Sequence, residues 1–249
     1  MTGPQTYADV FARHARIGFQ FSGGRDSTAA LHVLRPFWPR MEIYTVDTGD
    51  RWPETADVIR DMERLVGRPF TVIESNAPAY WRVMGRPSDV VPANRTPIGM
   101  AIKDGGEPVS DRFACCMANL MRPMHERMAA DGITLIVRGT RAADYEIPPV
   151  LSGDNDGCFE YLYPIDDWTT EQVNQYIEQH GLPLSPVYAE GSQHGSECLH
   201  CTAWWDDGRL PYLSRHYPVV FEQFERHVAR VHDAITDQFK PLTEGAIHG

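Results

Sequence analysis

The first third of the 249-residue chain alternates short apolar runs with amphipathic segments, and this alternation restricts the fold more than any other feature. Strands are predicted at residues 17–21, 42–46 and 70–73, and helices at 26–34 and from 53 onward. Such an alternation indicates a parallel sheet with crossover helices. Ligands of these sheets bind at the carboxyl ends of the strands, so the loops that follow the strands are the first places to look for function.

The rest of the chain is expected to complete this α/β domain. Residues 78–111 are rich in Pro and Gly without a clear period, which favours a long irregular lid or substrate loop. Further elements are expected as a helix at 117–130, a strand at 134–137, a second loop at 142–159, a helix from Thr169 or Thr170 to His180, turns at 182–196 and a helix at 219–235. The predicted fold is a parallel twisted sheet flanked by helices. Residues 1–210 form the main domain, and residues 211–249 form a helical C-terminal extension packed on it.

Composition bounds the class of protein. Hydrophobic residues make up 42% and charged residues 23%, as in a globular protein with an apolar core. The sequence has neither an apolar run long enough to cross a bilayer nor a secretory N-terminal stretch, so a cytoplasmic protein is expected. The net charge of −11 disfavours tight autonomous binding to nucleic acid, which requires clustered Lys and Arg.

A glycine-rich segment follows the first predicted strand and opens the next helix. It reads Ser22-Gly23-Gly24-Arg25-Asp26-Ser27. Glycines let backbone N–H groups surround phosphate oxygens, and the start of the helix adds the positive end of its dipole. The two serine hydroxyls and the arginine can bind the same oxygens, while Asp26 would repel them unless Mg²⁺ lies between. The segment therefore predicts binding of a nucleotide's phosphates, with a turn that binds nothing as the alternative.

Two other strand ends carry candidate site residues. Asp47 and Thr48 follow the second strand; Asp47 is suited to the metal or to positioning, or else it caps the turn before Gly49. Arg138 and Arg141 follow the strand at 134–137, where they either bind phosphate or an acceptor or are plain surface arginines.

Five cysteines occur, and four of them form two close pairs. These are Cys115-Cys116 and the Cys-x-x-Cys of Cys198 and Cys201, whereas Cys158 stands alone as a free cysteine. An odd count is poor evidence for a disulfide framework. Four thiolates suit a 4Fe–4S cluster or Zn²⁺, with free or redox-active thiols as the third alternative.

These motifs resemble those of a known family. The hexapeptide 22–27 resembles the pyrophosphate loop of the N-type ATP pyrophosphatases, whose fold is that of the adenine nucleotide alpha-hydrolases. Val46-Asp47-Thr48-Gly49 with the Pro53-Glu54-Thr55 segment resembles the phosphoadenosine phosphosulfate (PAPS) reductase family. Residues 138–141, 164–169 and 186–188 follow in that family's order. The cysteine pattern is similar to that of adenylylsulfate (APS) reductases, in which it holds a 4Fe–4S cluster.

One departure shapes the functional expectation. Sulfonucleotide reductases attack the substrate sulfur with a cysteine near the C-terminus, and this sequence has no cysteine after Cys201. With its intact loop, the chain resembles the ATP-cleaving branch of the family, as in DNA phosphorothioation. The leading expectation is therefore an ATP pyrophosphatase that uses Mg²⁺ to adenylate an acceptor in a sulfur-transfer pathway and carries a 4Fe–4S cluster. The expected catalytic residues are Asp26, Asp47, Arg138 and Arg141.

Two alternatives remain open at this stage. One is an APS or PAPS reductase that uses a thiol supplied in trans, and the other is a non-catalytic subunit that binds a nucleotide and a cluster. The expected partners are an adenine nucleotide, a sulfur donor or partner protein, and further copies of the chain in a homo-oligomer. DNA, tRNA and a small metabolite are all possible acceptors.

Overall fold

The computed structural model describes residues 4–96, 108–144, 150–193, 195 and 197–245. Contacts within the chain divide it into two units. Unit 1 comprises residues 1–47, 51–74 and 122–186, and unit 2 comprises residues 48–50, 75–121 and 187–249. The predicted boundary at residue 210 stays a prediction. Among the described residues, no helix is both long and apolar enough to cross a membrane.

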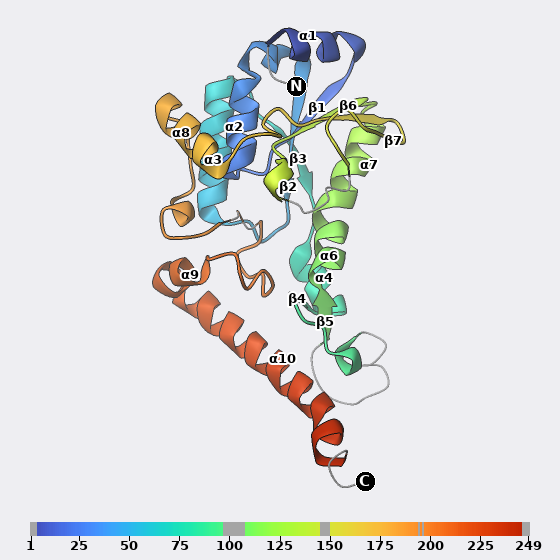
Figure 1. Ribbon diagram of the computed structural model, residues 1–249, viewed down its shortest axis with the longest axis vertical. Helices are drawn as coiled ribbons and strands as arrows, with labels where there is room; N and C mark the ends of the chain where they lie inside the picture. The colour runs from blue at the N-terminus through green and yellow to red at the C-terminus, as the bar shows by residue number, and fades with distance from the viewer. Residues whose placement is uncertain (1–3, 97–107, 145–149, 194, 196, 246–249) are drawn as a thin grey trace. The chain divides into compact units, whose positions relative to one another are not determined.

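Unit 1 is built on a six-stranded sheet of order β3-β2-β1-β6-β8-β7 (Figure 1). Its strands are β1 (Ile17–Gln20), β2 (Met41–Asp47), β3 (Thr71–Glu74), β6 (Leu135–Arg138), β7 (Asn155–Asp156) and β8 (Phe159–Leu162). Every neighbouring pair is parallel except the antiparallel pair of β7 and β8. The prediction of a mostly parallel sheet with flanking helices is thus confirmed.

Helices cover both faces of this sheet. They are α1 (Pro4–Arg13), α2 (Arg25–Val33), α3 (Pro53–Val66), α7 (Arg122–Ala130) and α8 (Thr170–His180). Helices α2, α3 and α8 lie on one face and α7 on the other (Figure 1). The main core forms beneath the first face, where Leu31, Met62 and Val173 are fully buried against the strands. On the other face, the Met128 side chain packs over Gly18 in β1.

Local sequence signals explain where these helices start and stop. Pro53 occupies the first turn of α3, where a missing N–H costs nothing, and Gly67 ends the helix in the left-handed region at φ +84°. Thr169 forms a capping box with Gln172 at the start of α8, as the sequence predicts. Gly181 then closes α8, also with a positive φ.

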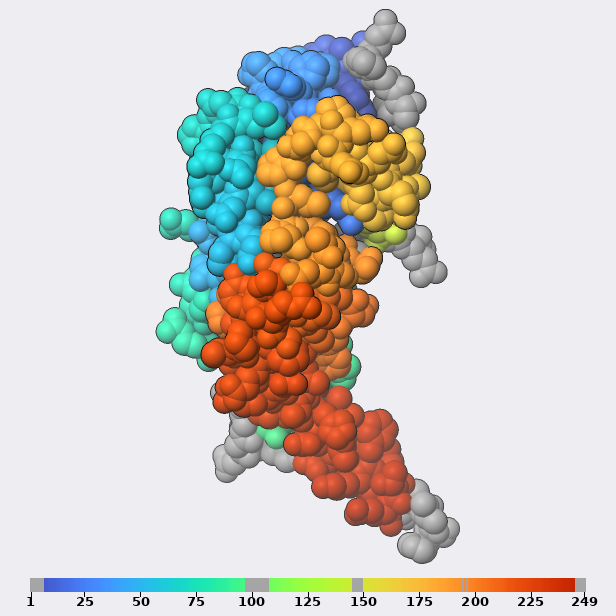
Figure 2. All heavy atoms as spheres, turned by 90° about the vertical axis from the view of Figure 1, so that its left-hand side faces the viewer, coloured from blue at the N-terminus to red at the C-terminus, as the bar shows by residue number. Residues whose placement is uncertain are grey.

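Unit 2 holds a second, smaller set of elements. They are α4 (Ala77–Met84), the parallel strands β4 (Arg86–Ser88) and β5 (Val109–Asp111), α6 (Arg112–Cys116), a π-helical segment (Met117–Met121), α9 (Leu210–His216) and α10 (Pro218–Gly245). Short 3₁₀ helices in the two units cover Arg35–Arg40, Ala93–Arg95, Ala142–Asp144 and Pro186–Tyr188. Helices α9 and α10 pack on each other and form the orange-to-red surface in Figure 2.

The prediction of one irregular loop over residues 78–111 is wrong for its described part. Asn76 caps α4 by accepting a hydrogen bond from the Ala79 N–H, and Pro78 sits in the first turn, where helices tolerate proline. Ala77 and Trp81, one turn apart, are both buried. The Pro and Gly content therefore marked the ends of short elements, and residues 97–107 of the predicted loop lie outside the described residues.

Other differences concern short or late elements. The sequence reasoning missed α1, α9 and β8. Helix α9 and strand β8 are too short to show a clear period. The C-terminal helix runs to Gly245, ten residues beyond its predicted end. Its apolar face loses burial there, since Phe239 and Leu242 are exposed. Similarly, residues 145–149 of the second predicted loop are outside the described part, and β7 and β8 occupy its end.

Gly139, just after β6, allows the closest backbone approach in unit 1. A Cβ at this position would lie 2.7 Å from the backbone N of Ser27 and 2.7 Å from the Asp26 carbonyl carbon. We expect Gly139→Ala to destabilise the protein by about 1–3 kcal/mol, because backbone cannot move aside as a flexible side chain can. The measurement is the free energy of unfolding in urea.

Gly67→Ala is the matched control for this prediction. Gly67 has a positive φ but open space around its missing Cβ, so only backbone strain of about 1 kcal/mol is expected. A Gly139→Ala protein as stable as the wild type would show that the two backbones are not held in contact.

Candidate functional site

The direction of chain connection reverses at β1. Strands β2 and β3 lie on one side of it, and β6, β8 and β7 lie on the other. The loop after β1 and the loop after β6 therefore flank the switch point of the sheet, where open α/β sheets leave a crevice for ligands. These loops carry the hexapeptide 22–27 and the segment 138–141, so topology brings together two motifs that are more than 110 residues apart in the sequence.

The loop after β1 is held in shape by its own polar groups. Gly23 has a positive φ of +77°, and a Cβ there would meet the Thr55 methyl group at 2.8 Å. The Ser22 and Ser27 hydroxyls lie 3.1 Å apart, and Ser22 Oγ also accepts a hydrogen bond from the Gly24 N–H. Ser22 is exposed whereas Ser27 is buried in the first turn of α2. The loop thus presents a hydroxyl and backbone N–H groups at the start of a helix, as anion sites do.

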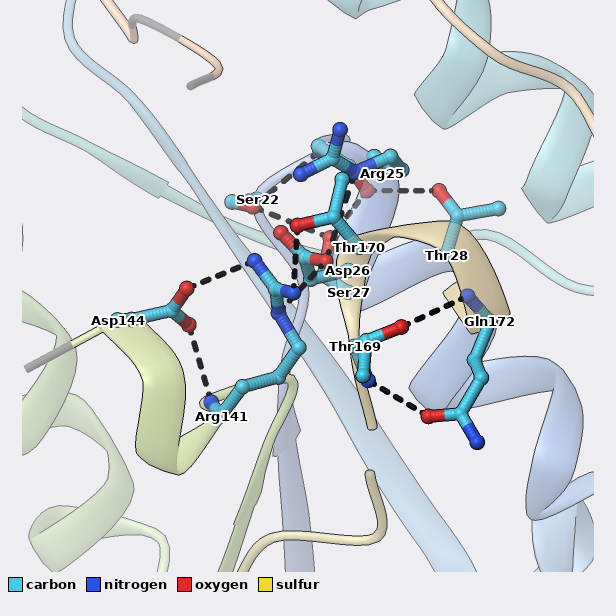
Figure 3. A network of polar contacts seen from close by, with 11 residues as sticks. Ser22, Arg25, Asp26, Ser27, Thr28, Arg141, Asp144, Thr169, Thr170 and Gln172 are labelled. Atoms are coloured by element: carbon cyan, nitrogen blue, oxygen red, sulfur yellow. Dashed lines mark hydrogen bonds and ion pairs between the residues drawn. The ribbon is translucent and has the colours of Figure 1, made fainter. Parts of the chain in front are cut away.

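Asp26, within this loop, lies close to two arginines, Arg25 and Arg141 (Figure 3). Its carboxylate is 3.1 Å from Arg141 Nε and 3.6 Å from Arg25 Nε, and both arginine side chains are almost fully buried. Burial raises the pKa of Asp26, Arg25 and Arg141 oppose that rise, and Asp144 adds to it. The carboxylate is therefore held in a region that favours an added proton or cation despite its two arginines.

Arg141 connects the loop after β6 to two elements that the sequence reasoning did not assign to the site. Its guanidinium donates to Asp144 Oδ1 at 2.8 Å and to the Thr170 hydroxyl at 3.0 Å. Figure 3 shows the Arg141 side chain between Asp144 and Asp26. Asp144 stands three residues after Arg141, a spacing that suits a helical turn, but only the 3₁₀ helix at Ala142–Asp144 reveals the contact.

The predicted site residues are only partly brought together. Ser22, Arg25, Asp26, Ser27 and Arg141 share the network described above, with Gly23 and Gly24 shaping it. Arg138 and Asp47 are the last residues of β6 and β2. Thr48 belongs to unit 2, where its hydroxyl accepts a hydrogen bond from Cys198 Sγ at 3.3 Å. Roles for Asp47, Thr48 and Arg138 at a nucleotide stay predictions.

The first cysteine pair of unit 2 lies at the end of α6. Asp111 caps this helix, and the π-helical segment begins directly after Cys116. Cys115 Sγ accepts hydrogen bonds from Trp81 Nε1 at 3.3 Å and from the Asn119 amide at 3.7 Å. Burial, with Cys201 and Cys115 nearby, raises the pKa of Cys116 to about 12.

The second pair lies beside the first. Cys198 packs against the buried group that contains Cys115 and Trp81. Cys201 stands three residues later and contributes to the raised pKa values of Cys115, Cys116 and Cys198, so the four thiols are called the cysteine cluster. Burial raises the pKa of Cys115 and of Cys198, which stabilises the protonated thiols. Cys158 is exposed in unit 1 and does not join them.

Two carboxylates that sequence reasoning missed brace this cysteine cluster. Asp50 accepts hydrogen bonds from the His200 backbone N–H at 2.8 Å and from the His200 ring at 2.7 Å. Asp89 accepts hydrogen bonds from the backbone N–H groups of Trp204 and Trp205, and it forms an ion pair with Arg112 at 3.0 Å. Trp204 has a positive φ of +62°, which is uncommon outside glycine and shows how firmly this segment is held.

The cysteine cluster is not arranged as a finished metal site. Within the described ranges, no group of three or more His, Cys, Asp or Glu side chains is positioned to hold a metal ion. All five cysteines are free thiols. The predicted 4Fe–4S or zinc site stays a prediction that rests on the donor set.

Comparisons with known proteins agree with this architecture. Residues 16–218 match the family model of the phosphoadenosine phosphosulfate reductase domain. The chain is 24% identical over 176 residues to a phosphoadenosine 5'-phosphosulfate reductase of Alkalilimnicola ehrlichii, covering 71% of this chain and 66% of that protein. It is 29% identical over 162 residues to an adenosine 5'-phosphosulfate reductase of Deinococcus radiodurans, covering 61% of this chain and 53% of that one.

A solved structure shows the same fold. The crystal structure of a phosphoadenylyl-sulfate (PAPS) reductase from Candida auris, in a phosphate complex, aligns with a TM-score of 0.57 at 12% identity. The alignment covers 78% of this chain and 86% of that one.

The mostly parallel sheet flanked by helices, with a glycine-rich loop at its switch point, defines an α/β protein of the class whose ligands bind at the carboxyl ends of the strands. Within that class, the match over residues 16–218 shows that the chain belongs to the phosphoadenosine phosphosulfate reductase domain family.

The raised pKa of Asp26 predicts a particular pH dependence of stability. The folded protein binds more protons than the unfolded chain between the usual Asp value of 3.8 and the raised folded-state pKa. The free energy of unfolding of the wild type, measured relative to Asp26→Asn, should therefore fall as pH rises through that window and then stay level. Urea unfolding of both proteins from pH 4 to pH 8 measures this difference. A relative stability that rises with pH would mean that the two arginines outweigh burial.

Proposed function

We propose that this protein is an enzyme that acts on an adenine nucleotide whose phosphates are bound by the loop 22–27. The observation that carries the proposal is the position of this loop at the β1–β6 switch point. The loop contains Arg25, and Arg141 lies beside its Asp26. Two buried guanidiniums, a helix start and the Ser22 hydroxyl favour binding of an anion with several oxygens.

The substrate class that family membership favours is a sulfonucleotide, either APS or PAPS. In such a reaction a thiolate attacks the sulfur of the sulfate group, the bond from sulfur to the phosphate oxygen breaks, and the nucleoside phosphate leaves. A second thiol then displaces sulfite and forms a disulfide. Because the 249 residues contain no cysteine after Cys201, the attacking thiol is proposed to lie outside these residues. The match spans 66% of the length of the Alkalilimnicola relative. That this chain shares the reductase activity of the whole relative is therefore a proposal.

A second candidate is ATP pyrophosphatase activity, and the contents of the loop favour it. Ser22 and Ser27 place two hydroxyls 3.1 Å apart, and Asp26 adds a carboxylate whose pKa is raised by burial. That carboxylate fits Mg²⁺, which would neutralise part of the phosphate charge when bound. In this reaction an acceptor oxygen attacks the α-phosphate of ATP and pyrophosphate leaves.

We further propose that the cysteine cluster of unit 2 holds a 4Fe–4S cluster, with zinc as the alternative. The donor set fits, because the four thiols come from two pairs in one unit, with Cys115 buried and the other three partly buried. Cys115, Cys116, Cys198 and Cys201 would be the ligands. A bound cluster would supply redox capacity, or it would support the segment 200–205 that Asp50 and Asp89 hold by hydrogen bonds.

Substrate assays with the purified protein separate the two candidates. Incubation with APS or PAPS and a dithiol protein is expected to release sulfite, and incubation with ATP and Mg²⁺ measures pyrophosphate. Pyrophosphate release without sulfite would replace the first candidate with the second. A protein that binds none of the three nucleotides would overturn the proposal.

Ser22→Ala tests the binding loop directly. The side chain is exposed, so the change should leave the free energy of unfolding within about 0.5 kcal/mol. Loss of one hydroxyl at the phosphates should weaken nucleotide binding by about 3–10-fold. Ser214→Ala, at an exposed position of α9, is the control that should bind as the wild type does. Equal nucleotide affinity in all three proteins would place the phosphates elsewhere.

Anaerobic purification with an iron and zinc count tests the cysteine proposal. The wild type should contain about four iron atoms and absorb visible light as 4Fe–4S proteins do. Cys201→Ser should lose the metal, because Cys201 interacts with all three of the other thiols, whereas Cys158→Ser should keep it. Metal-free wild type would remove the proposal, and stoichiometric zinc would select its alternative.

A further inference from the structure

Unit 2 contains a pocket of about 690 Å³ that the nucleotide proposal does not use. Helix α4, the start of β4 and the first half of α10 all contribute to its lining, through Arg82, Arg86 and Gln223 among others. Its volume lies in the range of sites that take small organic ligands.

The charges that line the pocket are not balanced. Asp50 is its carboxylate, and that group is already bound by the His200 ring and the His200 backbone N–H. Arg86 donates to the His200 carbonyl oxygen at 2.9 Å and stacks over Trp81, with 5.3 Å from its guanidinium carbon to the ring centroid. It has no acidic partner among the described residues.

Arg82 contributes the second positive charge. Its side chain is exposed at the pocket, and in the part of the chain that the structure describes it makes no hydrogen bond or ion pair. The lining therefore has two guanidiniums, one of them with all its donors available, against one carboxylate that is fully engaged. Guanidinium groups bind carboxylate and phosphate in a two-point geometry.

Beside the polar side chains of His200 and Gln223, the pocket has an apolar and tightly built wall. Pro78, Trp81 and Pro108 supply it. Gly85 has a positive φ of +89°, and a Cβ there would lie 1.9 Å from the Pro108 carbonyl oxygen, so the two segments meet at backbone distance. A rigid apolar wall beside two cations suits a ligand with a flat apolar part and an anionic group.

We propose that this pocket is a second ligand site, which binds a small organic anion carrying a phosphate or carboxylate on a planar apolar group. Arg82 and Arg86 bind the anionic group, and the wall formed by Pro78, Trp81 and Pro108 contacts the apolar part. The inference depends only on residues of unit 2 and is independent of what the nucleotide loop binds.

Trp81 provides a local readout for this proposal. Its indole N–H donates to Cys115 Sγ, so its NMR resonance reports on the pocket wall rather than on the loop 22–27. The resonance is measured in metal-free or zinc-containing protein, because an iron cluster bound at Cys115 would broaden it. Phenyl phosphate and benzoate are titrated into ¹⁵N-labelled protein, with uncharged phenol as the comparison, and the resonance is assigned from Trp81→Phe. Saturable movement with phenyl phosphate or benzoate is expected, and the anion that saturates identifies the class. Movement that is equal with phenol, or absent with both anions, would overturn the proposal.

Arg82→Gln tests the charge, and it should fold because the side chain is exposed. Loss of a charged hydrogen-bond donor should weaken binding of the saturating anion by about tenfold or more. Arg226→Gln is the matched control, since Arg226 is exposed on α10 and does not line the pocket. Ser22→Ala should also leave this affinity unchanged. Binding that falls in Ser22→Ala but not in Arg82→Gln would locate the anion at the nucleotide loop and overturn the second site.

Discussion

The contact between the end of β6 and the first turn of α2 is the constraint on which the candidate nucleotide site depends. Parallel pairing of β1 with β6 brings the two loops together, and Gly139 lets their backbones touch. Only this approach allows Arg141, two residues later, to reach Asp26. The glycine-rich loop starts the same helix, so this one packing contact positions both the loop and the charged groups beside it. A ligand would therefore meet a site that is already assembled.

The electrostatics of this site follow from burial more than from pairing. Arg25 and Arg141 are nearly inaccessible to water, and Asp26 shares their surroundings, so its ionised form is disfavoured although two cations stand beside it. An isolated surface ion pair would behave in the opposite way. The arrangement places two guanidiniums beside the loop together with a carboxylate that a divalent cation could bind. This combination is why the sulfonucleotide and ATP proposals both draw on the same residues.

The sequence predicted the parts of the fold that depend on repeating patterns. The strands and helices that were predicted in the first third lie within a few residues of their predicted bounds, because buried β-runs and amphipathic helices each have a clear period. It failed over residues 78–111, where α4, β4 and β5 are too short for a period to show. For the site, the hexapeptide was visible as a motif. No motif indicated Asp144, Thr170, Asp50 or Asp89. Their roles come from tertiary contacts that no local pattern encodes.

The π-helical segment between α6 and α7 has a consequence for how one stretch of chain serves two units. Each i→i+5 turn holds one residue more than an α-helical turn, which offsets the side chains on either side by about 100°. The boundary between the units falls at its end, between Met121 and Arg122. The cysteines before it and the methionines of α7 after it can therefore face different surroundings without a break in the helix. The segment therefore lets one continuous helical stretch present the thiols on one side and the α7 methionines on another.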